Sequence, residues 1–149
     1  MADIMTERTS TAHWSGTLFE GSGNFSVGSG AFGPLDVSWA RRAGEPEGAT
    51  SPEELIAAAH ASCYAMALSN ALAENGTPAQ DLEVTSKVGF GPKDGGGVEV
   101  KYSKLSVKGK VDGVTAEQFD ELAKAGEAGC PISNALRNNV KIELESTLE

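Results

Sequence analysis

The sequence is poor in cationic residues. Its 149 residues hold 12 Lys and Arg against 21 Asp and Glu, which gives a formal net charge of −9. Nucleic acids and anionic membrane surfaces attract proteins with a surplus of Lys and Arg. We therefore expect neither a nucleic acid nor a membrane among the partners of this protein.

Cysteines are also scarce, and no signal peptide is evident. Residues 1–10 carry Asp3, Glu7 and Arg8 and lack the apolar core of a secretory signal. We expect a cytoplasmic protein, whose thiols are normally reduced. The two cysteines, Cys63 and Cys130, are too few for the disulfide framework of a small secreted domain. They are either inert core residues or residues used in chemistry.

The composition and element order predict one α+β domain over residues 1–149. A hydrophobic fraction of 40% with 22% charged residues is typical of a globular protein. Neither GxxxxGK[ST] nor a GxGxxG between a strand and a helix occurs, so no phosphate-binding loop is indicated. Periodicity and turn residues predict three short strands at 11–20, 25–27 and 35–39, followed by a long helix at 52–74. Two longer strands follow at 82–90 and 98–111, then two helices at 115–124 and 130–138 and a last strand at 140–148. The order lacks the βαβ repeat of a doubly wound fold and favours antiparallel sheets.

The long helix has the clearest start signal in the sequence. Ser51 stands at the N-cap position, Pro52 at N1 and Glu54 at N3, which is a capping box, and Gly76 follows the end of the helix. Between residues 55 and 72 the helix is apolar on nearly every face, so we expect it at the centre of the fold or at a subunit interface. A membrane span is the competing interpretation, but alanine dominates the segment and four of its residues are polar.

Cys130 is the stronger functional candidate of the two cysteines. It occupies the N-cap position of a short helix whose first residue is Pro131, where free N–H groups favour a thiolate. Cys63 lies inside the apolar helix, where a cysteine often serves as a small core residue. Together the two cysteines fit a peroxidatic and resolving pair.

A buried thiolate needs a nearby cation, because burial alone raises the pKa of a thiol. Arg41 and Arg42 precede the long helix and supply two candidates, although a solvated pair of loop charges is the plainer interpretation. Glu53 at N2 is free to orient an arginine. Glu53 and Cys63 lie roughly 15 Å apart along a straight helix. Either the helix bends or the carboxylate and the sulfur of one site come from different subunits.

Other side chains leave several interpretations open. His60 lies one turn before Cys63 and is either a base for its thiol or a hydrogen-bonded core residue. A zinc site from His60, Cys63 and Cys130 would need a fourth ligand, and His13 has no partner in the sequence. Core packing or the lining of an apolar substrate site accounts for the remaining large aromatic residues, namely Trp14, Trp39, Tyr64 and Phe119.

Two motifs resemble the OsmC/Ohr family of thiol-dependent peroxidases. They are SPEELIAAAHASCYAMALS at 51–69 and AGCPIS at 128–133, and the order of strands and helices agrees over nearly the whole chain. The sequence around Cys63 and the Trp-x-x-Arg at 39–42 are more similar to the OsmC branch of the family than to its organic-hydroperoxide-resistance branch. The resemblance implies an intertwined homodimer, with antiparallel sheets around a long buried central helix and an active site at each subunit boundary.

The resemblance also implies roles for individual residues. Cys63 matches the peroxidatic cysteine, Cys130 the resolving cysteine and Glu53 the carboxylate that holds an arginine against the thiolate. That arginine maps to Arg42, with Arg41 as the alternative. The implied activity is reduction of organic hydroperoxides, and more weakly of hydrogen peroxide, in oxidative or osmotic stress defence. It uses a dithiol reductant such as a lipoylated protein, and neither a metal nor an organic cofactor. The alternative is a stress-induced protein of this fold that binds a small apolar ligand and has little peroxidase activity.

Overall fold

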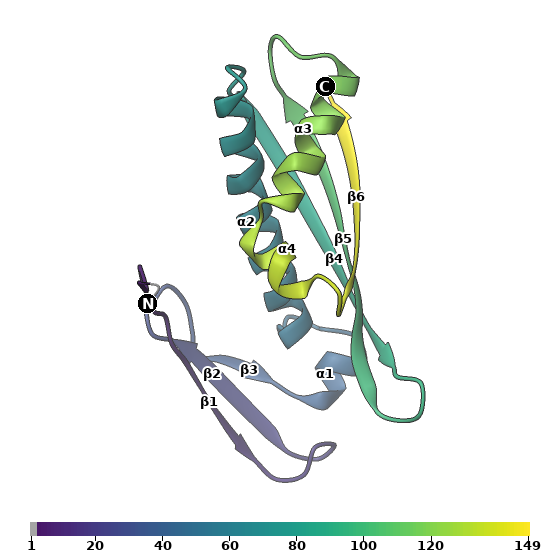
Figure 1. Cartoon of the computed structure of the whole chain (residues 1–149). Helices are drawn as coiled ribbons and strands as arrows, with labels where there is room; N and C mark the ends of the chain where they lie inside the picture. The colour runs from purple at the N-terminus through teal and green to yellow at the C-terminus, as the bar shows by residue number, and fades with distance from the viewer. Residues whose placement is uncertain (1–2) are drawn as a thin grey trace. The chain divides into compact units, whose positions relative to one another are not determined.

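The computed structural model describes residues 3–149 and divides into two compact units (Figure 1). The first unit ends at Pro52, and the second comprises Glu53–Glu149. Met1 and Ala2, the start of the segment in which we expect no signal peptide, lie outside the described residues. One domain over residues 1–149 stays a prediction.

The first unit is the expected antiparallel meander followed by a short helix. Strands β1 (Ser10–Ser15), β2 (Ser22–Val27) and β3 (Leu35–Val37) pair in that order, and α1 (Trp39–Ala43) follows. The first strand ends earlier than predicted because Gly16 takes a φ of +91° and begins the turn. Helix α1 was predicted as the end of a strand and a loop. It forms because the Ser38 hydroxyl accepts a hydrogen bond from the Arg41 N–H and caps the helix.

The second unit contains the long helix and a three-stranded sheet. Its elements are α2 (Pro52–Glu74), β4 (Asp81–Pro92), β5 (Val98–Lys110), α3 (Ala116–Ala128), α4 (Pro131–Leu136) and β6 (Lys141–Leu148). Strands β4 and β5 are antiparallel, as expected. The prediction of wholly antiparallel sheets is wrong for β6, which pairs parallel to β5. A parallel neighbour needs a crossover connection, and α3 and α4 supply it between the two strands.

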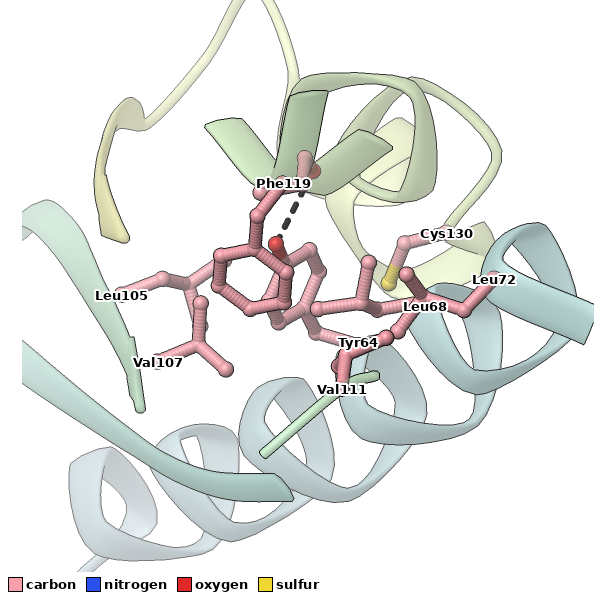
Figure 2. Packing of buried hydrophobic residues seen from close by; sticks show 9 residues of the cluster. Tyr64, Leu68, Leu72, Leu105, Val107, Val111, Phe119 and Cys130 are labelled. Atoms are coloured by element: carbon pink, nitrogen blue, oxygen red, sulfur yellow. Dashed lines mark hydrogen bonds between the residues drawn. The ribbon is translucent and has the colours of Figure 1, made fainter. Parts of the chain in front are cut away.

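Helix α2 contributes one face to the core of the second unit. Residues at every fourth position of α2 point inward, namely His60, Tyr64, Leu68 and Leu72, and each has 0% exposure. Figure 2 shows three of them packed with residues of β5, α3 and the start of α4, namely Leu105, Val107, Phe119 and Cys130. A dashed line in Figure 2 marks the hydrogen bond that the Tyr64 hydroxyl donates to the Ala123 carbonyl, at 2.9 Å.

The other face of α2 is not covered in a single chain. Met66 is 69% exposed, so the expectation of burial on all sides does not hold within one copy. By length and composition alone α2 could cross a bilayer, a property that core helices of soluble proteins share. The exposed Met66 is compatible with the alternative expectation, a subunit interface.

Helix α3 begins as predicted but ends later. The Thr115 capping box is present, with Gln118 at N3. The sequence predicts that this helix ends near residue 124, before Gly126, yet the glycine lies inside the helix. A Cβ on Gly126 would lie 3.0 Å from the Cα of Leu68. Gly126 is therefore explained by the close approach of α3 to α2 and not by a helix end.

Candidate active site

The structure brings the two cysteines of the chain into contact. Cys130 lies at the N-cap position of α4, as predicted, and its sulfur accepts a hydrogen bond from the Ser133 N–H at 3.5 Å. The Cys130 Sγ lies 3.4 Å from the Cys63 Sγ, and both thiols are free. Cys130 is fully buried, whereas Cys63 is partly accessible. A partly accessible thiol beside a buried one is the arrangement that a peroxidatic and resolving pair requires.

The second unit by itself disfavours a Cys63 thiolate. Burial raises the pKa of the Cys63 thiol, and the neighbouring Cys130 thiol raises it further. Hydrogen bonding to the Ile132 backbone lowers this pKa, with an effect that is smaller than that of burial, so the pKa stays above its ordinary value. Because the thiolate is the nucleophile, this cysteine needs a cation beyond these neighbours to react at neutral pH.

Both ring nitrogens of His60 are within hydrogen-bond distance of serine hydroxyl groups. Its Nδ1 lies 2.6 Å from the Ser103 Oγ and its Nε2 lies 2.7 Å from the Ser133 Oγ. Burial lowers the pKa of His60, with Glu127 acting in the opposite direction. Both ring nitrogens are thus engaged, which disfavours a general-base or metal-ligand role. Within residues 3–149 no group of three His, Cys, Asp or Glu residues is placed to hold a metal ion.

Sequence reasoning missed the serine residues around His60. Ser103 stands at an inward position of β5, in register with the buried Leu105 and Val107. A serine in an otherwise apolar inward row signals a polar partner inside the core. Ser133 lies three residues after the N-cap residue Cys130. This is the position whose backbone N–H donates a hydrogen bond to the side chain of an N-cap residue. Both signals are readable in the sequence once the buried face of the strand is known.

The two candidate arginines have different surroundings in the first unit. Arg41 forms an ion pair with Glu47 through Nη1. Arg42 lines an apolar pocket of about 410 Å³ together with tryptophan and aliphatic side chains, including Trp14, Leu18, Val37 and Trp39. Trp14 is 43% exposed, so it lines this pocket and is not the core residue that we considered.

Glu53 begins the second unit and is buried, with 6% exposure. It lies on the same uninterrupted helix as Cys63, so the estimate of roughly 15 Å along the helix applies. Arg42 belongs to the first unit and Glu53, Cys63 and Cys130 to the second, and each unit is described by itself. The pairing of Arg42 with Glu53 and with the thiolate stays a prediction.

Comparison with known proteins identifies the family. A family model described as OsmC-like protein matches residues 44–145, a range that includes Glu53 and both cysteines. The chain belongs to the OsmC/Ohr family. Arg41 and Arg42 lie just before the part that matches the family model.

Individual OsmC/Ohr proteins are similar over most of the chain. Peroxiredoxin OsmC of Escherichia coli (strain K12) is 35% identical over 136 residues, which cover 90% of this chain and 92% of that protein. Organic hydroperoxide resistance protein OhrA of Bacillus subtilis (strain 168) is 36% identical over 105 residues, covering 70% and 72%. The crystal structure of an organic hydroperoxide resistance protein from Elizabethkingia anophelis superposes with a TM-score of 0.74 at 25% identity, covering 98% of this chain and all of that one. The predicted α+β OsmC/Ohr fold is confirmed.

Proposed function

We propose that the protein is a cysteine-based peroxidase that reduces organic hydroperoxides to alcohols. Relatives named peroxiredoxin and organic hydroperoxide resistance protein support a role in hydroperoxide chemistry. The contact of 3.4 Å between the Cys63 and Cys130 sulfurs is the observation that carries the proposal. A disulfide between them needs only a small further approach, to about 2.05 Å.

The reaction proceeds in three steps. The Cys63 thiolate attacks the distal oxygen of the hydroperoxide, and the O–O bond breaks to give an alcohol, after protonation, and a Cys63 sulfenic acid. The Cys130 thiol then displaces the hydroxyl of the sulfenic acid, which forms the disulfide and releases water. An external dithiol reduces the disulfide by exchange and is itself oxidised to a disulfide. We propose a lipoylated protein of the cytoplasm as the dithiol.

Arg42 is the proposed cation beside the Cys63 thiolate. Arg42 lines the apolar pocket, whereas Arg41 forms its ion pair with Glu47 outside that lining, and we therefore assign the role to Arg42. A guanidinium stays charged when partly buried and binds a carboxylate with two hydrogen bonds, which fits Glu53 as the group that orients it. The apolar pocket that Arg42 lines fits an organic substituent better than it fits hydrogen peroxide, because that lining offers the small polar molecule few partners.

The active protein is proposed to be a homodimer with a site at each subunit boundary. The exposed face of α2 carries Met66 among small residues such as Ala59, Ser62 and Ala73. Small residues around a large exposed apolar side chain allow a second helix to approach closely, which suits an interface. A second subunit also resolves the distance along α2, because an arginine held by Glu53 of one chain can serve Cys63 of the other.

Intact-mass analysis tests the proposed function. The reduced protein is mixed with one equivalent of cumene hydroperoxide, and in a parallel sample with one equivalent of hydrogen peroxide. We expect a product lighter by two hydrogens, with a peptide map that joins Cys63 to Cys130, and faster conversion with the organic peroxide. An unchanged mass with both peroxides contradicts the peroxidase and supports the alternative of a protein that binds a small apolar ligand.

A further inference from the structure

We infer that His60 is a positioning residue for the resolving step, which holds Cys130 next to Cys63 through Ser133. The inference rests on the proposed peroxidase function and adds a role for a buried group that the reaction scheme does not use. It is carried by a chain of hydrogen bonds that reaches from the sheet to the sulfur of Cys130.

The chain of hydrogen bonds joins four elements of the second unit. The Ser86 Oγ on β4 lies 3.0 Å from the Ser103 Oγ on β5, and Ser103 contacts His60 on α2 at 2.6 Å. His60 contacts the Ser133 hydroxyl on α4 at 2.7 Å, and the Ser133 N–H donates to the Cys130 sulfur. We call Ser86, Ser103, His60 and Ser133 the serine–histidine chain.

The inner members of the serine–histidine chain are shielded from water. Ser103, His60 and Ser133 each have 0% exposure, so no solvent replaces a hydrogen bond that is lost. A serine hydroxyl both donates and accepts, and a neutral imidazole does one at each nitrogen. The serine–histidine chain is therefore satisfied with either nitrogen of His60 protonated. Breaking it at one position leaves a buried polar group without its partner.

The spacing on the two helices links the serine–histidine chain to the sulfurs. Cys63 follows His60 by three residues on α2, and Ser133 follows Cys130 by three residues on α4. Residues three apart on a helix are neighbours on one face. The contact between His60 and Ser133 therefore joins the turn of α2 next to the Cys63 sulfur to the turn of α4 next to the Cys130 sulfur.

This tie matters for the fate of the sulfenic acid. Resolution forms the bond between the sulfurs and releases water, and it competes with a second hydroperoxide that would oxidise the sulfenic acid to sulfinic acid. The rate of resolution depends on how often the Cys130 sulfur is at contact distance. The first step, attack of the Cys63 thiolate on the peroxide, does not use the Cys130 sulfur, and α4 bears on it only through the hydrogen bond between Cys63 and the Ile132 backbone. Loss of the tie should therefore slow resolution much more than peroxide attack.

Two amide substitutions separate the two sides of His60. The amide of a glutamine reaches about as far as Nε2, so His60→Gln keeps a partner for Ser133. The shorter amide of an asparagine reaches about as far as Nδ1, so His60→Asn keeps a partner for Ser103 and loses Ser133. Ser133→Ala removes the hydroxyl on the cysteine side and leaves the imidazole in place. Tyr64→Phe is the matched control, because it removes another buried hydrogen bond of α2, made to α3 and not to α4.

The experiment follows both steps after rapid mixing of each reduced protein with cumene hydroperoxide. The initial rate of peroxide consumption reports the first step, and acid-quenched intact mass reports sulfenic acid, disulfide and sulfinic acid. We expect His60→Asn and Ser133→Ala to form the disulfide about tenfold more slowly and to accumulate sulfinic acid, while the initial rate of peroxide consumption changes much less. We expect His60→Gln to recover most of the resolution rate and Tyr64→Phe to match the unsubstituted protein. Circular dichroism first establishes that each variant is folded.

The outcomes distinguish this inference from the proposed function. Resolution at the unsubstituted rate in both His60→Asn and Ser133→Ala overturns the positioning role. An equal slowing in Tyr64→Phe also overturns it, because the effect would then reflect general destabilisation of α2. Failure of the unsubstituted protein to consume peroxide or to form any disulfide overturns the proposed function itself.

Discussion

The sulfur of Cys130 lies 3.4 Å from the sulfur of Cys63, although 67 residues separate the two cysteines in the sequence. The crossover returns the chain to the side of α2 and places Cys130 at the N-cap position of α4, directly after α3. The two thiols are in van der Waals contact before any chemistry has occurred. The reduced protein is thus arranged for a disulfide without movement of whole elements.

Substitution of the two cysteines by serine should stop the reaction at different steps. We expect Cys63→Ser to abolish consumption of cumene hydroperoxide, because no nucleophile remains. Cys130→Ser should complete about one turnover without added thiol, because the sulfenic acid has no resolving partner, and only the oxidation of sulfenic to sulfinic acid then consumes more peroxide. Peroxide is measured by a colorimetric assay over time. Full steady activity of Cys63→Ser would contradict the mechanism.

Replacement of the two arginines should identify the cation of the site. Arg42→Met keeps an apolar side chain of similar length in the pocket and removes the charge. Burial already raises the pKa of Cys63, and we expect the loss of the positive charge to raise it further. Each increase of the pKa by one lowers the fraction of thiolate at neutral pH about tenfold. Ultraviolet titration of the thiolate and the pH dependence of peroxide consumption measure the shift. Arg41→Met is the control, because Arg41 pairs with Glu47, and a larger loss in this variant would assign the role to Arg41 instead.

Gly109 should tolerate no side chain. A Cβ at this position of β5 would lie 2.5 Å from the Cζ of Phe119, whose ring is fully buried. We expect Gly109→Ala to lower the free energy of unfolding by about 2 kcal/mol, measured by urea denaturation. Gly91→Ala on β4 is the matched control, since its Cβ would make an ordinary contact of 3.7 Å with Lys101. Equal stability of the two variants would show that the ring of Phe119 can move aside.

Acid should destabilise the protein through His60. Burial lowers the pKa of His60 in the folded state, so the unfolded chain binds a proton more readily. Stability is therefore complete above the ordinary histidine pKa of about 6.5 and falls as the pH decreases toward the folded value. Urea denaturation between about pH 5 and 7.5 measures this slope, and His60→Gln should lack it. Asp120, whose pKa is lowered chiefly by its hydrogen bond with Lys124, titrates below this range.

A charge on the exposed face of α2 should prevent dimer formation. Met66 is 69% exposed in one chain, so Met66→Glu leaves the fold of the single chain intact. We expect the variant to sediment as a monomer and to lose peroxidase activity, because each site is proposed to need both subunits. Ala116→Glu, at an exposed position of α3, is the control and should remain dimeric. A dimeric Met66→Glu variant would place the interface elsewhere.

The sequence predicted the elements and the pair of cysteines because their signals are local. Capping residues mark the starts of α2 and α3, and the N-cap position of Cys130 follows from the proline after it. The parallel pairing of β6 was missed because strand periodicity carries no information about direction. Gly126 was taken for a helix end because its reason, the nearness of Leu68, lies on another helix.

The serine–histidine chain was hidden for a similar reason. His60 was recognised as a residue with two interpretations, but its partners lie 43 and 73 residues away. A serine is common on surfaces, so its burial becomes visible only when the inward face of β5 is known. Polar contacts between distant elements therefore depend on the tertiary structure, whereas caps and turns do not.

The separation of the two cysteines by 67 positions in the sequence has a thermodynamic consequence. A bond between the two sulfurs closes a long loop, which reduces the entropy of the unfolded chain and stabilises the folded one by about 4 kcal/mol. In the proposed catalytic cycle, a reduced form that unfolds more easily alternates with an oxidised form that resists heat. Exposure to peroxide would transiently make this protein harder to unfold and to degrade, at the moment when its activity is in demand.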